Sequence, residues 1–514
     1  MVKRAGAIGG PIVSGAVFAL ILAALVAVMS KANWPISFGV SDWAVVRFTI
    51  WQAILSASLS VVFAIPVARA LARRQFQGRS ALVTLLGAPF ILPVIVAVLG
   101  ILTVFGRTGW SSQLLGIFGL PPLSIYGLQG VVLAHVFFNM PLATRLILQG
   151  WQSIPTEQFR LVGQLGLPPY EVFKTLEWPL LKQVLPGALA LIFVICLTSF
   201  AVALTLGGGP KSTTIELAIY QAFRFDFDLG RAAILSILQL VLAGTSAMLA
   251  LWILPPIVLQ SGFDRPLVRW DARGNFPRIL DAIYIGVATI FLILPLSAVV
   301  VYGLIGLVKV PSTVWFAAWT STWLAVISTG LLIIMALPVS AWLGGSKKGG
   351  AETLTLLGLA ASPLMVGTGW FIIIYPLADP QYFALLVTAL VNAIMALPFA
   401  VRVLVPGMRQ SLVDYGRLNI SLGLHGFLVW RIVLLPRIRT RLGFAAGLAA
   451  AMSVGDLGVI TLFANPEWAT LPLQMYRLMG SYQTTAASGA ALILLVLALG
   501  LFWICDYWGR YAES

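Results

Sequence analysis

The sequence has few charged residues and few of the side chains that usually carry out chemistry. Only 10% of its 514 residues are charged, and it has two histidines and two cysteines. Soluble globular domains have about 25% charged residues, so this chain is too apolar to be one. Cys196 and Cys505 have no paired spacing, which argues against a disulfide framework or a metal cluster. We expect no metal and no cofactor.

Apolar sequence dominates the chain, at 60% of all residues. Runs of roughly 18 or more apolar residues are long enough to cross about 30 Å of hydrocarbon. Such runs form two series of six along the chain. They lie near 12–32, 48–68, 81–104, 128–149, 184–205 and 231–257, and near 279–306, 321–343, 353–375, 383–405, 440–462 and 487–507. The pattern predicts an all-α polytopic membrane protein with about 12 transmembrane helices.

The basic residues follow the predicted topology. A net charge of +15 could indicate a nucleic-acid partner. With the N-terminus placed inside, most basic residues fall on the inner side, as the positive-inside rule requires. The eight that fall outside are Lys31, Arg47, Arg107, Lys211, Arg224, Arg231, Lys309 and Arg477. We therefore expect a multi-pass membrane protein with both termini in the cytoplasm, embedded in lipid and without a nucleic-acid partner.

One segment recurs at a fixed offset of 257 residues. Its first copy starts at Arg160 and continues to Pro179, and its second starts at Arg417 and continues to Pro436. Six predicted spans separate the copies, so both face the same compartment and the halves are parallel repeats. We expect a first repeat at 1–258 with its core at about 48–257, a cytoplasmic linker at 259–278, and a second repeat at 279–514 with its core at about 321–507. The transport pathway is expected between the halves.

Each copy predicts a short helix, a sharp turn and a second helix on the membrane surface. Gly166 and Gly423 suit the left-handed conformation that ends a helix, while Pro179 and Pro436 are expected to end the second helix. Loops are usually variable. Two loops of the same pattern therefore indicate that each binds one copy of the same cytosolic partner.

These two loops resemble the coupling loop of type I ABC importer permeases, which docks into a cleft on an ATPase subunit. The family's opening glutamate is Arg160 and Arg417 here, so the role of that acid does not carry over. The whole chain resembles the subfamily with two fused permeases, as in ferric iron and thiamine importers. The resemblance implies the type I permease fold and two copies of a cytoplasmic ABC ATPase as partners. The implied contact residues are Arg160, Leu161, Gly166, Leu167 and Pro179, with Arg417, Leu418, Gly423, Leu424 and Pro436.

A narrower resemblance covers mainly the first half. Segments 47–53, 126–130, 134–139, 143–145, 177–179, 206–210 and 213–221 are similar to the membrane subunit of the thiamine and thiamine pyrophosphate ABC importer. This resemblance implies import of thiamine and its phosphates, delivered by a periplasmic thiamine-binding protein. Ferric iron, carried by permeases of the same fused layout, is the alternative substrate.

Four polar residues inside predicted spans are candidates for the pathway, because a charge buried in the bilayer costs at least about 2.5 kcal/mol. Asp456, in the eleventh predicted span, could attract the cationic thiazolium of a thiamine-like ligand; a cap or a helix contact near Gly455 and Gly458 is the other interpretation. His135, Asn139 and Asn392 lie in the fourth and tenth spans. Hydrogen bonds between packed helices are the alternative for these three.

Other function classes fit the sequence less well. Residues 206–213 read LGGGPKST, but Pro210 replaces the glycine of a phosphate-binding loop and no strand precedes it; energy for transport would therefore come from a partner ATPase. A proton-coupled secondary transporter typically has an acid in the loop after its second span, and 68–79 has none. A membrane enzyme would need a catalytic constellation, which His135 and His425 do not supply. We expect a transport subunit and not an enzyme.

Overall fold

The computed structural model describes residues 9–32, 39–253, 269, 274–346, 362–424, 426–463 and 468–510. Within these ranges the secondary structure is helical and contains no strand. Eleven helical segments of this part are long and apolar enough to cross a membrane. The prediction of an all-α polytopic membrane protein is therefore confirmed. The ninth predicted span lies partly outside the described residues, and the rest of it forms the short apolar helix α16 (Pro363–Ile374).

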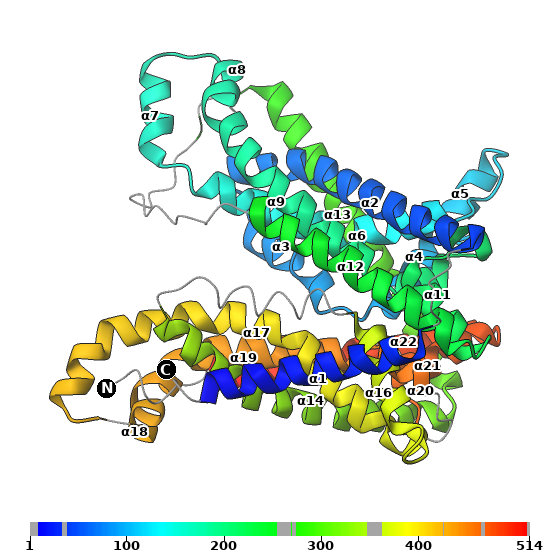
Figure 1. Cartoon of the computed structure of the whole chain (residues 1–514). Helices are drawn as coiled ribbons and strands as arrows, with labels where there is room; N and C mark the ends of the chain where they lie inside the picture. Colours follow the sequence, from blue (N-terminus) through cyan, green and yellow to red (C-terminus); the bar gives the residue numbers. More distant parts are fainter. Residues whose placement is uncertain are drawn as a thin grey trace.

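The first half contains both long helices and short ones, labelled in Figure 1. They are α1 (Gly9–Lys31), α2 (Val40–Arg73), α3 (Arg79–Leu85), α4 (Val94–Phe105), α5 (Trp110–Ile117), α6 (Leu128–Gln152), α7 (Thr156–Gln164), α8 (Pro169–Val172), the π-helix η3 (Phe173–Glu177), α9 (Trp178–Leu197), α10 (Ala201–Leu206), α11 (Ile215–Arg224) and α12 (Leu229–Ile253), with short 3-10 turns at Ala88–Phe90 and Pro210–Ser212.

The second half repeats this order. It contains α13 (Asn275–Gly306), α14 (Ser312–Gly345), α16, α17 (Pro380–Ser421), α18 (Phe427–Val429), the π-helix η7 (Trp430–Leu434), α19 (Leu435–Val454), α20 (Gly458–Phe463), α21 (Leu471–Gly480) and α22 (Thr484–Arg510), with a 3-10 turn at Leu307–Lys309. One hydrogen bond that occurs in both halves shows that their helices correspond. The Ile215 amide donates to Thr49 Oγ1 at 2.9 Å, and the Leu471 amide donates to Ser321 Oγ at 2.8 Å. Helices α11 and α21 are thus fixed to α2 and α14 in the same way.

Three predicted spans are interrupted. The third, expected at 81–104, is divided into α3 and α4 by a stretch that contains Pro89 and Pro93, where proline cannot continue a regular helix. The fifth and eleventh were expected to run to 205 and 462. Instead α9 ends at Leu197 and α19 at Val454, and each is followed after three residues by a short helix, α10 or α20.

The first helix of each half packs on the other half. Helix α1 lies against α14 and α16, while α13 lies against α2 and α4. Close approach depends on glycine: a side chain at Gly100 of α4 would meet the Pro295 carbonyl of α13 at 2.5 Å. The halves therefore interlock. The boundaries at 258 and 279 stay a prediction, because most of the linker lies outside the described residues.

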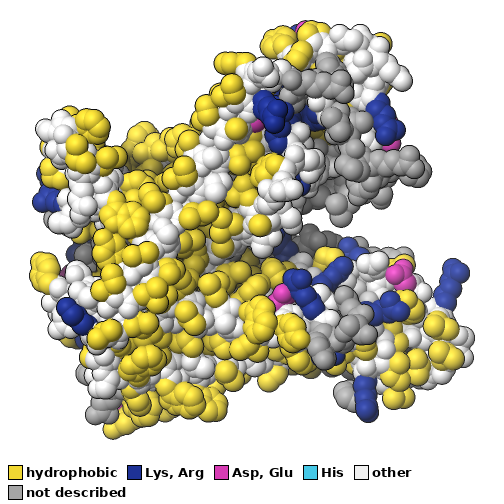
Figure 2. Space-filling view, turned by 180° about the vertical axis from the view of Figure 1, so that it is seen from behind, with side chains coloured by type: hydrophobic (Ala, Val, Ile, Leu, Met, Phe, Trp, Pro, Cys, Tyr) yellow, Lys and Arg dark blue, Asp and Glu magenta, His cyan; other side chains and the backbone are white. Residues whose placement is uncertain are grey.

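The long helices form two arms that meet at one end of the molecule and separate at the other (Figure 1). One arm contains α2, α6, α9, α12 and α13, and the other contains α1, α14, α17 and α19. We call the separated end, which carries α7 and α18, the loop end, and the opposite end the far end. Figure 2 shows a cleft between the arms that opens at the loop end, where Lys and Arg side chains gather. Helix α1 begins there, with Gly10 against Trp342, and α22 ends there, with Gly509 against Gly443.

Candidate functional site

The two repeated loops have the same turn. Gly166 has φ +62° and Gly423 has φ +64°, a left-handed conformation that side chains disfavour. The amide of the residue after each glycine donates to the carbonyl five residues earlier. Leu167 N donates to the Val162 carbonyl at 3.3 Å, and Leu424 N donates to the Asn419 carbonyl at 2.9 Å. This is the Schellman pattern of helix ends. The predicted glycine turn is confirmed in both copies.

Both loops expose apolar side chains at their tips. Leu161 and Leu165 are 57% and 65% exposed, and the matched Leu418 and Leu422 are 50% and 62% exposed. Arg160 and Arg417 are also exposed, whereas Leu167 and Leu424 are half-buried. Exposed apolar patches with a polar rim are typical of protein interaction sites. The tips therefore have the surface that a docking site needs.

The second helix of each loop differs from the prediction. It is not a separate helix, and neither Pro179 nor Pro436 ends it. Helix α8 passes through the π-helix η3 directly into α9, and η7 passes likewise into α19. Pro179 and Pro436 are the second residues of α9 and α19, directly after the π-helices. Each loop is thus joined directly to a long helix on this side.

The other side of each loop is attached differently in the two halves. Helix α6 ends at Gln152 and α7 begins at Thr156, with Pro155 between them. The residue at the same offset in the second half is Leu412, and there α17 runs without interruption for 42 residues to Ser421. Proline at 155 lacks the N–H that a continuous helix would use. The first loop therefore follows a break, and the second extends a single helix.

A buried ionic cluster supports the first loop, and the described residues around the second loop form no such cluster. Glu177, at the end of η3, is completely buried. Its carboxylate accepts from Arg69 Nε at 2.8 Å and from Arg269 Nη2 at 2.6 Å, and it lies 3.7 Å from Arg73 Nη2. The sequence analysis did not identify this cluster. The signal was present, because position 434, at the offset of 257 residues, has leucine where the first half has an acid.

The second loop is supported by apolar packing. Leu434 is 3% exposed and packs in one cluster with Met408, Val429, Val433 and Ile438. Arg437 of α19, after the turn, places its guanidinium carbon 3.7 Å from the ring centre of Tyr415 of α17, before the turn. A leucine in such a cluster needs no charged partner, and Arg437 instead interacts with an aromatic face.

Three of the four candidate pathway residues form two polar groups, one in each half. His135 Nδ1 lies 3.2 Å from Ser56 Oγ, and Asn139 Nδ2 donates to Cys196 Sγ at 3.3 Å. In the second half, Asn392 Nδ2 donates to Ser453 Oγ at 3.1 Å. Positions 135 and 392 share the repeat offset, and so do 196 and 453. His135 and Asn139 are buried within the first bundle, so they lie inside one half and not between the two.

Asp456 is not inside a helix, because it lies in the break between α19 and α20. Its Oδ1 accepts from the Gly458 amide at 3.1 Å, which caps α20. The neighbouring Gly455 packs against Pro93 of the first half, and Gly458 lies near Phe200. Asp456 is half-buried. Of the four candidates it is the one placed beside the contact between the halves.

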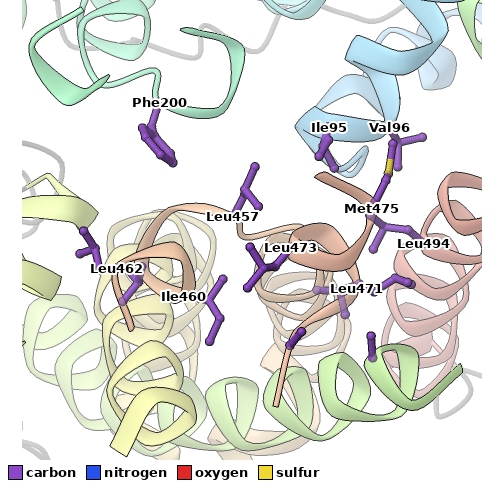
Figure 3. Close-up of a cluster of buried hydrophobic side chains, with 14 of the residues drawn as sticks. Ile95, Val96, Phe200, Leu457, Ile460, Leu462, Leu471, Leu473, Met475 and Leu494 are labelled. Carbon is purple, nitrogen blue, oxygen red and sulfur yellow. The ribbon is translucent and has the colours of Figure 1, made fainter. Parts of the chain in front are cut away.

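Apolar side chains close the contact between the halves towards the far end. Phe200 and Leu457 share the repeat offset, occupy the breaks after α9 and α19, and belong to one buried cluster with Ile95 and Met475 (Figure 3). Phe223 of α11 packs edge-on against Phe371 of α16, with ring centroids 4.7 Å apart. The cleft that opens at the loop end is thus sealed by packed side chains.

One buried hydrogen bond also joins the halves at the far end. Ser362 Oγ, at the start of α16, donates to Glu216 Oε2 of α11 at 2.8 Å. Burial raises the pKa of this carboxyl to about 7.

Within the described ranges no three His, Cys, Asp or Glu residues come together as a potential metal site.

The chain aligns with curated permeases over almost its whole length. It is 41% identical over 475 residues to the thiamine transport system permease protein ThiP of Brucella abortus (strain 2308), covering 90% of this chain and 87% of the relative. The chain belongs to the family of thiamine transport permeases. The permease of Escherichia coli (strain K12) is likewise 41% identical over 480 residues, with 90% and 88% covered. This permease is therefore a multi-pass membrane protein and a transport component.

A more distant relative aligns with only part of this permease. The probable sulfate transport system permease protein cysT of Helicosporidium is 27% identical over 217 residues, which cover 42% of this chain and 78% of the relative. A shorter permease thus corresponds to less than half of the present one. No family model matches the chain.

Proposed function

We propose that this chain is the transmembrane subunit of an ATP-driven importer for thiamine and its phosphates in a bacterial inner membrane. Two copies of a cytoplasmic ABC ATPase dock on the loops at Gly166 and Gly423, and a periplasmic thiamine-binding protein delivers the substrate. The observation that carries the proposal is the pair of loops: they have the same left-handed glycine, the same backbone hydrogen bonds and exposed leucines at matched positions.

The arrangement of the halves supports coupling through these loops. Both lie at the end where the arms separate and the cleft opens (Figures 1 and 2). ATPases that draw the loops together would close the loop end and loosen the apolar contacts around Phe200 and Leu457 at the far end. We place the loop end in the cytoplasm, where ATP is available, and this puts both termini there. The Lys and Arg side chains at that end fit this orientation.

The substrate assignment is supported by the names of the relatives and by one residue. Relatives that are 41% identical are named thiamine transport permeases. Thiamine carries a permanent positive charge on its thiazolium ring, and Asp456 is a half-buried carboxylate beside the contact between the halves. A carboxylate there would offset the charge of the passing ring. Replacing Asp456 with serine, the residue at matched position 199, is expected to lower thiamine uptake and to leave ATPase binding unchanged.

Reconstitution tests the function directly. The chain, its ATPase and its binding protein in liposomes are expected to accumulate labelled thiamine only when ATP is supplied. Uptake driven by a proton gradient without ATP would indicate a secondary transporter. ATP-dependent uptake of ferric iron without thiamine uptake would select the alternative substrate.

Docking is tested separately with Gly423→Trp. A bulky side chain at φ +64° is strained and would rebuild the tip. We expect the variant to insert in the membrane but to lose the ATPase on purification. Copurification at the wild-type level would rule out this loop as a docking site.

A further inference from the structure

Arg269 belongs to the segment that joins the two halves, yet its side chain lies inside the first loop. The guanidinium Nη2 bonds to Glu177 Oε1 at 2.6 Å, and the guanidinium carbon lies 4.4 Å from the centre of the Phe159 ring. Its side chain is only 6% exposed. An arginine that combines a buried ion pair with an aromatic stack has a fixed orientation.

The two groups that Arg269 contacts lie on opposite sides of the loop. Phe159 belongs to α7, before the Gly166 turn, and Glu177 ends η3, after it. Phe159 also packs with Val162 and Val172 in the small apolar core of the loop. Arg269 therefore connects the incoming and outgoing sides of the loop through a single side chain.

The first loop needs this connection because its incoming side is interrupted. Helix α7 is separated from α6 at Pro155, so the direction of α6 does not determine the direction of α7. In the second half, the matched position is Leu412 within continuous α17, and Leu434 takes the place of Glu177. A continuous helix sets the direction of the second loop, and no described residue there makes an ionic contact like that of Arg269.

The burial of Glu177 makes the contact strong. A fully buried carboxylate is costly unless it is paired and hydrogen-bonded. Glu177 has Arg69 and Arg73 of α2 on one of its oxygens and Arg269 on the other. Arg269 thus supplies the hydrogen bond to Glu177 Oε1, whereas Arg69 and Arg73 lie at Oε2. Removing Arg269 leaves Oε1 buried without this donor, which is costly.

We propose that Arg269 is a positioning residue for the first loop: it holds α7 in the orientation that the ATPase recognises, so the linker between the halves contributes to the first docking site. This inference rests on the proposed function, in which both loops bind ATPase subunits. It gives the fusion of two permeases into one chain a mechanical role.

Cross-linking at matched loop positions tests the proposal in the assembled transporter. Leu165→Cys and Leu422→Cys occupy equivalent exposed sites, in a Cys505→Ser background where the remaining Cys196 is buried. Arg269→Ala is expected to lower cross-linking to the ATPase at position 165 by roughly tenfold, the size of a lost charged hydrogen bond. The yield at position 422 is expected to stay at the wild-type level, which also shows that the protein is folded.

Two further variants separate positioning from simple destabilisation. Arg269→Lys keeps a positive charge beside Glu177 and should restore part of the yield at position 165. Phe159→Leu removes the ring below the guanidinium and should lower the yield at position 165 only.

Three outcomes would contradict these expectations. An unchanged yield at position 165 in Arg269→Ala, or equal losses at both positions, would overturn the role of Arg269. Absence of cross-linking at both positions in the otherwise wild-type transporter would overturn the proposed function itself, and this inference with it.

Discussion

The first and second loops present nearly the same tip and are held in place by different means. Around Gly166 and Gly423 the backbone angles differ by 2° (φ +62° and +64°). Behind the tip, the first loop has a helix break at Pro155 and a buried ionic cluster at Glu177. The second has an uninterrupted helix through Leu412 and apolar packing at Leu434.

The comparison separates two requirements on a coupling element. In the proposed function each tip must fit an ATPase subunit, and the two tips have the same backbone turn. The support must only hold the tip, and either a rigid helix or a set of buried contacts can do so. Two differences between the halves are therefore linked: proline against leucine at 155 and 412, and glutamate against leucine at 177 and 434. The half with the broken helix is also the half with the ionic cluster.

Replacing Glu177 with leucine, the residue at 434, is expected to have the largest effect. It leaves buried arginines without their anion, and breaking a buried ion pair costs about 3–5 kcal/mol. The midpoint of thermal unfolding in detergent should fall clearly below that of the wild type. The matched control is Leu434→Met, a volume-conserving change that should cost less than about 1.5 kcal/mol. Equal midpoints for the two variants would contradict the asymmetry.

Introducing a break in the second half is expected to have the next largest effect. Leu412→Pro removes a hydrogen bond within α17 and costs about 3 kcal/mol. Because the described residues around the second loop form no ionic cluster that could replace the helix, cross-linking to the ATPase at position 422 should fall strongly while that at position 165 stays unchanged. Leu412→Met serves as the control. A proline variant that cross-links normally at 422 would show that continuity of α17 is not what orients this loop.

Valine at either tip glycine should have a smaller and equal effect. No atom lies within 4 Å of a side chain added at Gly166 or Gly423, so the cost is backbone strain alone, about 1–2 kcal/mol. Gly166→Val and Gly423→Val should each weaken ATPase binding about tenfold, measured by titration of the purified ATPase. Clearly unequal losses would mean that the tips are not equivalent.

Removing the break in the first half should have the smallest effect. Pro155→Leu copies Leu412 and is expected to change stability by less than about 1 kcal/mol. Its consequence should appear in combination: with α6 and α7 continuous, Arg269→Ala should reduce cross-linking at position 165 less than it does with Pro155 present. If the loss is the same in both backgrounds, the break is not the reason that Arg269 is needed.

The fold class and the glycine turns could be predicted because apolar run length and glycine conformation are local properties. Gly166 and Gly423 take the expected left-handed angle. The breaks after Val454 and Leu197 could not be predicted, since the apolar runs continue through them and packing between the halves decides where the helices stop. For this reason the sequence predicted Asp456 inside a span, whereas in the structure it caps α20.

The ionic cluster was missed for a related reason. Glu177 is separated by about a hundred residues from Arg69 and Arg269, so only the folded chain brings them together. Periodicity and spacing describe neighbours along one element, and they do not reveal such contacts. A comparison of the two halves position by position would have marked Glu177, because its counterpart is Leu434.

The central claim is that two equivalent docking loops rely on different supports, and a crossed experiment tests it most directly. ATPase cross-linking at positions 165 and 422 is measured in Glu177→Leu and in Leu412→Pro. The account predicts that Glu177→Leu lowers the yield at 165 alone and that Leu412→Pro lowers the yield at 422 alone. Equal losses at both positions in each variant, or no loss in either, would contradict it.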